Sequence, residues 1–238
     1  MKVAVIFIGT NKYLDFLPKY YESIEEYFLP NSEKIILAFT DGEMDEVPDN
    51  ITVYHQEHLE WPYITLKRFD IITKARTAIE ECDWLIFLDA DTRVVDTVTE
   101  DDVFTNKPYI GVHHPCHALG MQPHQEYPGA FETDLKSRAA VTEDDDTSMY
   151  YQGCLWGGRV PEVLDMIDEL NNRTNEDLEN DVIAKWHDES QLNKFYSEVK
   201  EDVHLLGPEY AYPEVFKNYC TFDPKIVHLA KDNSSYQT

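Results

Sequence analysis

This sequence of 238 residues has few basic residues and no long hydrophobic run. It contains 20 lysines and arginines against 46 aspartates and glutamates, a formal net charge of −26. Because phosphate binding needs clustered Lys and Arg, this charge argues against nucleic acid and against an anionic membrane surface as partners. The apolar run Val3–Ile8 is too short to span a membrane and lacks a signal-peptide layout. We therefore expect a cytoplasmic protein without a membrane anchor.

Cysteine is also scarce, and the chain has no internal repeat and no Pro- or Ser-rich linker. The four cysteines show no C-x-x-C spacing, so neither a disulfide framework nor a zinc site is expected. The missing linker predicts a single domain over residues 1–238. Most of the carboxylates are expected to form a solvated surface, and only motifs can identify those that hold a divalent cation.

Short apolar strands alternate with helical stretches in the first half of the chain. Strands are expected at Val3–Ile8, Lys34–Phe39, Ile51–His55 and Trp84–Leu88, and helices at Leu14–Phe28 and Leu66–Glu81. This alternation predicts an α/β fold with a mostly parallel central sheet flanked by helices. Binding sites in such sheets gather at the carboxyl ends of the strands, and Asp89 follows the last of these strands directly.

The second half is less regular. Residues 113–146 carry turn residues and an acidic patch, and they are expected to form a long loop or a small β excursion. Helices are expected at Val160–Leu170 and Asp177–Trp186, continuing over Gln191–Tyr196, and the tail His228–Thr238 is polar. A polar terminal segment of this kind is often poorly ordered.

Two carboxylates at i and i+2 follow the buried strand, at Asp89 and Asp91. Side chains with this spacing can reach one cation from a turn, and oxygen ligands suit Mn²⁺ or Mg²⁺. Such a cation can neutralise a diphosphate leaving group. The pattern alone is weak, because Asp144-Asp145-Asp146 also satisfies it and reads as a charged loop. The position after the strand favours Asp89 and Asp91, with strand-end capping as the alternative.

Two adjacent carboxylates stand at Asp188 and Glu189, next to an imidazole and the indole of Trp186. At a helix start neighbouring side chains point apart, so the two acids are expected to contact different groups. Either one could act as a base, a nucleophile or an acceptor for sugar hydroxyls. The alternative is a first helical turn in which acids interact favourably with the helix dipole.

Two further segments are less specific. Tyr150–Gly158 is aromatic and rich in glycine, which fits close approach to a ligand or equally a bulged core strand. His113 and His114 lack the spacing of a structural zinc site. We therefore expect one histidine to form hydrogen bonds in a cleft, with a structural histidine as the alternative.

In this order the motifs resemble glycosyltransferase family six, the family of the histo-blood-group A and B transferases and α-1,3-galactosyltransferase. The matching positions are Phe39-Thr40-Asp41, Asp89-Ala90-Asp91, His114-Pro115, Tyr150-Tyr151-Gln152-Gly153, Gly157-Gly158, Trp186-His187-Asp188-Glu189-Ser190 and Pro208-Glu209-Tyr210. The resemblance covers nearly the whole chain. It implies a GT-A glycosyltransferase fold, with residues 1–95 as the nucleotide-binding half and residues 96–238 as the half that binds donor sugar and acceptor.

The resemblance also implies a role for individual residues. Glu189 matches the proposed catalytic carboxylate, and Asp89 and Asp91 match the pair that holds Mn²⁺ and UDP, with Mg²⁺ as the alternative ion. Donor-binding positions match at Tyr13, Arg68, Asp89, Asp91, Gln152, Gly153, Cys154, Asp188 and Lys231, and acceptor-binding positions match at His114 and Trp186. Tyr13 would stack on uracil, and Lys231 would close over the diphosphate.

The implied reaction is a retaining transfer of galactose or N-acetylgalactosamine, in α-1,3 linkage, from a UDP-sugar to an oligosaccharide or glycan acceptor. Two departures from the family pattern leave parts of this open. A family arginine that grips phosphate falls near Gln237, and an acceptor-site aspartate is replaced around Pro213-Glu214. The alternatives are a sugar- or UDP-binding module with decayed catalysis, and a glycoside hydrolase that uses two carboxylates.

Overall fold

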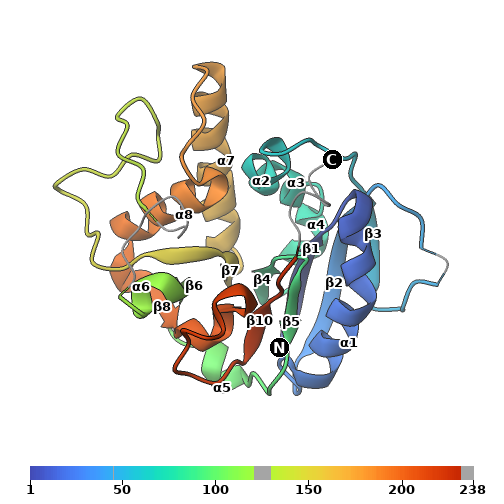
Figure 1. Ribbon diagram of the computed structural model, residues 1–238. Helices are drawn as coiled ribbons and strands as arrows, with labels where there is room; N and C mark the ends of the chain where they lie inside the picture. Colours follow the sequence, from blue (N-terminus) through green and yellow to red (C-terminus); the bar gives the residue numbers. More distant parts are fainter. Residues whose placement is uncertain (45, 121–129, 232–238) are drawn as a thin grey trace.

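The computed structural model describes residues 1–44, 46–120 and 130–231, and a seven-stranded sheet forms its centre (Figure 1). The strand order is β3-β2-β1-β4-β7-β6-β8, in which only β7 runs antiparallel to its neighbours. The bounds are β1 Lys2–Ile8, β2 Glu33–Thr40, β3 Ile51–His55, β4 Trp84–Leu88, β6 Tyr109–His113, β7 Tyr151–Arg159 and β8 Val203–Leu206. This architecture confirms the α/β prediction of a mostly parallel sheet flanked by helices.

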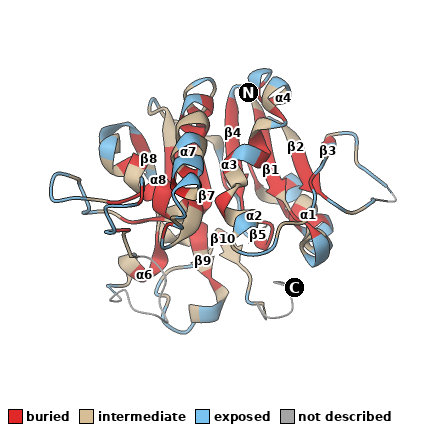
Figure 2. Cartoon of the chain, turned by 90° about the horizontal axis from the view of Figure 1, so that it is seen from above, coloured by how far each residue is buried: buried red, intermediate tan, exposed pale blue. Residues whose placement is uncertain are grey.

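Helices bury both faces of the sheet, and in Figure 2 the strands are mostly buried while exposed residues lie on the outer helices. Alternate residues of β1 point to opposite faces: Val3, Val5 and Phe7 pack with one hydrophobic cluster, and Ala4 and Ile6 with the other. The first cluster includes residues of α1 Leu17–Tyr27; the second includes residues of α3 Arg68–Thr73, α4 Arg76–Glu80, α7 Glu162–Glu179 and α8 His187–Glu198. Burying each large apolar side chain contributes roughly 1.5–3 kcal/mol.

The four strands expected in the first half are all present, and those at Ile51–His55 and Trp84–Leu88 have the expected bounds. The helix expected from Leu14 begins differently. Residues Asn11–Phe16 form a 3₁₀ helix, and the α-helix starts at Leu17. Pro18 explains this start, because its fixed φ and missing N–H suit the first turn of an α-helix.

Two helix predictions differ from the structure. The helix expected over 66–81 is split into α2 Tyr63–Leu66, α3 and α4, with Lys67 and Ala75 in non-helical conformations at the breaks. The helix expected over 177–186 was wrong, because α7 ends at Glu179 and α8 starts only at His187. Asp181 has a φ of 57°, a left-handed conformation that terminates a helix. The expected helical stretch Gln191–Tyr196 lies within α8.

The described part of the region expected to be irregular is mostly loop. Between His113 and Tyr151 the described residues, 114–120 and 130–150, contain the short helix α6 Pro115–Ala118 and no strand, so the predicted β excursion is absent from that part of the chain. A separate three-stranded sheet has the order β5-β10-β9, with β5 Thr92–Val94, β9 Tyr212–Pro213 and β10 Ile226–His228. A helix α5, Glu100–Val103, follows β5. Within the described residues, no helix is both long and apolar enough to cross a membrane.

Candidate active site

A cleft of about 250 Å³ lies at the carboxyl ends of β1 and β4. Parallel pairing of these two strands brings the segment after β1, which carries Tyr13, next to the segment after β4, which carries Asp89 and Asp91. This is the edge of a doubly wound sheet at which ligands bind. The residues that line the cleft are Ile8, Thr10, Tyr13, His58, Leu59, Trp61, Ile64, Thr65, Arg68, Asp89, Ala90, Asp91, His228 and Lys231. The sequence-predicted residues Tyr13, Arg68, Asp89, Asp91 and Lys231 therefore share one cleft.

The acidic pair occupies a tight turn between β4 and β5. Thr92 closes the turn, since its N–H and its hydroxyl both donate to the Asp89 carbonyl, at 3.0 and 2.7 Å. Strand β10 pairs antiparallel with β5 and places His228 opposite Thr92. The His228 Nε2 atom is 3.2 Å from Asp91 Oδ1 and 3.8 Å from Asp89 Oδ2. One ligand atom from each of Asp89, Asp91 and His228 lies within 4.8 Å of the other two, close enough to share a metal ion.

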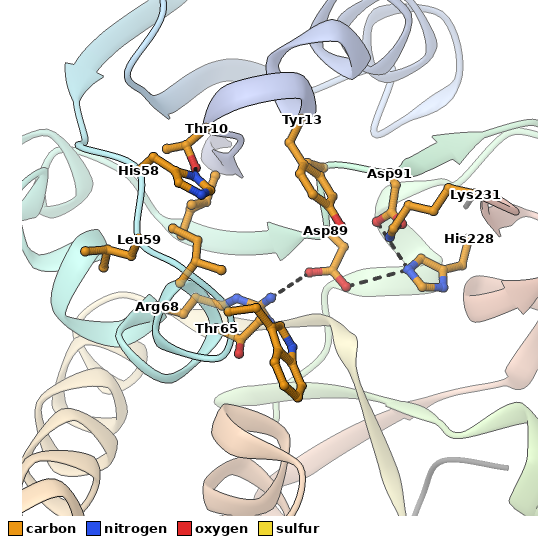
Figure 3. Close-up of a pocket in the computed structure, with 14 residues that line it drawn as sticks. Thr10, Tyr13, His58, Leu59, Thr65, Arg68, Asp89, Asp91, His228 and Lys231 are labelled. Carbon is orange, nitrogen blue, oxygen red and sulfur yellow. Dashed lines mark hydrogen bonds and ion pairs between the residues drawn. The ribbon is translucent and has the colours of Figure 1, made fainter. Parts of the chain in front are cut away.

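Cations surround this acidic turn. Figure 3 shows Asp89 between Arg68 and His228, and the Arg68 Nη2 atom lies 3.0 Å from Asp89 Oδ1. Lys231 forms an ion pair with Asp91. Burial opposes ionisation of Asp91, but the charges and hydrogen bonds of His228 and Lys231 outweigh it and lower the pKa of that carboxyl. The turn is therefore anionic at neutral pH, and the adjoining cations suit a phosphate-bearing ligand.

Arg68 connects the acidic turn to the start of α8. Its Nη1 atom lies 2.5 Å from Asp188 Oδ2, and the side chain of Asp188 is only 7% exposed. Burial raises the pKa of Asp188 to about 6, against the opposing charge of Arg68. The guanidinium also lies over the Phe87 ring, 4.4 Å from its centroid. Asp188 is thus a buried, paired carboxylate and not a solvated acid of the first helical turn.

Glu189 points to a different set of partners, as expected for neighbouring residues at a helix start. Tyr150 donates a hydrogen bond to Oε1 at 2.7 Å, and the Gly153 N–H donates to Oε2 at 2.8 Å. Burial raises the pKa of Glu189 to about 7, although both of these donors oppose the rise. Asp188 and Glu189 are therefore both held by specific polar contacts. The alternative, in which acids of the first helical turn only interact with the helix dipole, requires no more than exposed acids.

Most of the glycine-rich segment forms the buried strand β7, as the alternative of a core strand predicted. The same segment also contacts residues of the site. A Cβ atom on Gly153 would lie 3.1 Å from the Cβ of Glu189, so the close approach is to that side chain. The Cys154 carbonyl accepts from the Asp89 N–H at 2.9 Å, and Cys154 is a buried free thiol. The Gln152 Oε1 atom is buried without a hydrogen-bond partner. Gly153 and Cys154 therefore lie between the acidic turn and Glu189.

The predicted acceptor residues lie outside the lining of the cleft. His114 is buried and caps α6, where its Nδ1 accepts from the Cys116 N–H at 3.2 Å. Burial and the neighbouring histidines lower the pKa of His114 to about 3. Trp186 is partly buried just before α8, and its Nε1 is buried without a hydrogen-bond partner. The structure thus assigns His114 a capping contact, and its contact with an acceptor stays a prediction, as does that of Trp186.

His228 is the site residue that the sequence analysis did not identify. It was placed at the start of a polar tail, and the available signal was its position after the apolar pair Ile226-Val227, which forms a short strand. The charged loop reading of Asp144–Asp146 fits the structure, since Asp145 pairs with Lys194 at 2.6 Å. Gln237 lies outside the described residues.

Comparison with known proteins gives consistent matches. The sequence profile of "Glycosyltransferase family 6" matches residues 1–237. The O-antigen biosynthesis glycosyltransferase WbnI of Escherichia coli is 29% identical over 238 residues, covering 99% of this chain and 97% of that protein. Histo-blood group ABO system transferase 1 of Rattus norvegicus is 25% identical, covering 96% of this chain and 66% of that protein.

A third relative, globoside alpha-1,3-N-acetylgalactosaminyltransferase 1 of Homo sapiens, is 26% identical and covers 90% of this chain and 62% of that protein. The chain therefore spans nearly the whole bacterial relative but less than two thirds of these two mammalian proteins. The family profile extends over both halves of the sheet and over every site residue described above.

Proposed function

Because this chain belongs to glycosyltransferase family 6 and so has the GT-A fold, we propose that it is a retaining, metal-dependent transferase of galactose or N-acetylgalactosamine. The donor is a UDP-sugar, the acceptor is a glycan, and the new linkage is α-1,3. The observation that carries the proposal is the single cleft in which Asp89, Asp91 and His228 adjoin the cation Lys231 and the aromatic ring of Tyr13. These groups supply what a metal-bound nucleoside diphosphate requires.

The donor would lie across the carboxyl edge of the sheet. Tyr13 lies beside Lys231, whose Nζ is 5.1 Å from the ring centroid, so a base stacked on Tyr13 would hold its diphosphate near that cation. We assign nucleotide binding to residues 1–95 and donor-sugar and acceptor binding to residues 96–238. Arg68 and Asp188 would then meet the sugar hydroxyls at the boundary between the two.

The donor set of Asp89, Asp91 and His228 fits a divalent cation such as Mn²⁺. Two carboxylates with one imidazole are ligands that Mn²⁺ accepts readily, and the third ligand disfavours Mg²⁺ relative to an all-oxygen site. When bound, the ion would offset the charge that grows on the departing UDP. Glu214 supports the same region, because its Oε2 accepts from the Ala230 N–H at 2.8 Å beside Lys231.

Retention of configuration means that the new bond forms on the face of the sugar that the leaving UDP vacates, and we assign to Glu189 the role of the carboxylate on the opposite face. The carboxylate either forms a transient covalent glycosyl intermediate or stabilises an oxocarbenium-like transition state. Its hydrogen bonds to Tyr150 and Gly153 hold it in one orientation. Because the carboxylate is already held in place, it does not have to reorient when positive charge develops at the anomeric carbon.

The test is release of UDP from UDP-galactose and from UDP-N-acetylgalactosamine, measured with Mn²⁺ and with EDTA. Slow hydrolysis to water should occur even without the natural acceptor. Release from at least one donor that EDTA abolishes is the expected result. Release that EDTA leaves unchanged would overturn the metal role of Asp89 and Asp91. No release, together with no UDP binding by calorimetry, would overturn the transferase itself and favour a hydrolase or a binding module without catalysis.

A further inference from the structure

Tyr150 is a fully buried residue that directly contacts Glu189. It immediately precedes β7, and it is 0% exposed. Its hydroxyl donates to Glu189 Oε1 at 2.7 Å, while the Gly153 N–H, three residues along the same segment, donates to Oε2 at 2.8 Å. Each carboxylate oxygen therefore receives one hydrogen bond, one from the residue that enters β7 and one from β7 itself, and the two bonds fix the plane of the carboxylate.

Aromatic neighbours on several sides hold the Tyr150 ring. His117 of α6 stacks on it at 4.9 Å between centroids and 21° between planes. His114 and Phe131 contact it edge-on, at 5.6 and 4.9 Å. Because these contacts restrict the ring, its hydroxyl has little freedom to leave the carboxylate. Tyr150 thereby also links the predicted acceptor residue His114 to Glu189.

The phenol remains a donor across the working pH range. Burial raises the pKa of Tyr150 well above 10, and the charge of Glu189 adds to the rise. Asp188 and Asp89 face Glu189 with like charge and raise its pKa further. Cys154 and Cys116 also lie near it, and burial raises the pKa of both thiols. Against these groups, a hydrogen bond to the charged form favours ionisation of Glu189.

We propose that Tyr150 is a positioning residue of the transfer reaction, whose hydroxyl stabilises the Glu189 carboxylate and sets its orientation toward the anomeric carbon. This inference rests on the proposed function of Glu189. Phenylalanine at this position would keep the aromatic contacts and lose the hydrogen bond alone. The hydroxyl therefore has a role separable from packing.

The experiment compares Tyr150→Phe with Tyr196→Phe, a matched control. Tyr196 is also fully buried and donates its hydroxyl at 2.6 Å, but to the Ile110 carbonyl away from Glu189. Both variants lose one buried hydrogen bond, so their losses of stability should be similar. UDP release from the UDP-sugar donors is measured against pH, and UDP affinity is measured by calorimetry.

For Tyr150→Phe we expect kcat to fall by about 10- to 100-fold, the range for a lost hydrogen bond to a charged group. KM and UDP affinity should stay within about threefold of wild type, and the acid limb of the pH–rate profile should move up by about one pH unit. Tyr196→Phe should keep kcat and the profile.

Equal kcat in the two variants, or a lower kcat with an unmoved acid limb, would overturn the role of Tyr150. Failure of the proposed function is distinct, because the wild-type protein itself would then release no UDP from either donor.

Discussion

Replacing Arg68 tests the electrostatic arrangement of the site most directly. The guanidinium pairs with Asp89 and Asp188, and its side chain is only 12% exposed. Arg68→Met keeps much of the packing over Phe87 while it removes the charge. Asp188 is then left buried without its cation, the situation in which a broken ion pair is most destabilising.

The magnitude follows from the pKa of Asp188, which burial raises from an ordinary 3.8 to about 6 even with Arg68 present. At about 1.36 kcal/mol per pH unit, the buried charge already costs about 3 kcal/mol at neutral pH. A raised pKa means that the protonated folded state is favoured, so stability is highest below the unfolded pKa and is lost as pH rises through the folded one. Without Arg68 the pKa rises further, and we expect Arg68→Met to lose about 3–5 kcal/mol at pH 8.

The assay is urea unfolding of wild type and Arg68→Met at pH 8 and pH 5. At pH 5 the variant's Asp188 is protonated, so the difference should shrink to about 1 kcal/mol. Arg76→Met is the matched control, because Arg76 pairs with Asp168 at the surface, with side chains 35% and 49% exposed. The control should lose less than about 1 kcal/mol at either pH. Equal losses in both variants, or a loss in Arg68→Met that does not shrink at pH 5, would refute the reasoning.

Three further predictions concern the reaction itself. Glu189→Gln should lose most UDP release while keeping UDP binding by calorimetry, and wild-type release should rise with pH through about 7 as Glu189 ionises; near wild-type turnover or a flat profile would contradict its role. His228→Gln should raise the Mn²⁺ concentration for half-maximal activity at least about tenfold, and an unchanged titration would remove it from the metal site. Gly153→Ala, whose Cβ would lie 3.1 Å from that of Glu189, should lower kcat about tenfold without weakening UDP binding. An unchanged kcat would show that the strand shifts to accommodate the added methyl group without disturbing Glu189.

The sequence was most informative where local pattern and burial agree. The strand at Trp84–Leu88 forms as expected, since a continuous apolar run suits a strand buried on both faces of the sheet. The strand at Ile51–His55 also forms as expected; it lies at the edge of the sheet, is mostly exposed, and is rich in the β-branched and aromatic residues that favour strands. Helix ends were harder. Asp177 lies in α7, and its carboxylate accepts from the Ser137 hydroxyl at 2.7 Å and from the Arg138 N–H at 2.6 Å, contacts with a distant loop. Such contacts leave no mark in the periodicity of the helix.

The sequence by itself determined the strands in the first half of the chain, the position of Asp89 at a strand end and the divergence of Asp188 and Glu189. These follow from burial and from the backbone geometry of neighbouring residues. Only the tertiary structure decided that His228 joins Asp89 and Asp91, because that contact depends on the pairing of β10 with β5. The hydrogen bond from Tyr150 to Glu189 likewise depends on how α8 packs on β7. Both contacts join residues far apart in the chain, and their geometry is set by the packing of whole elements, which no local pattern encodes.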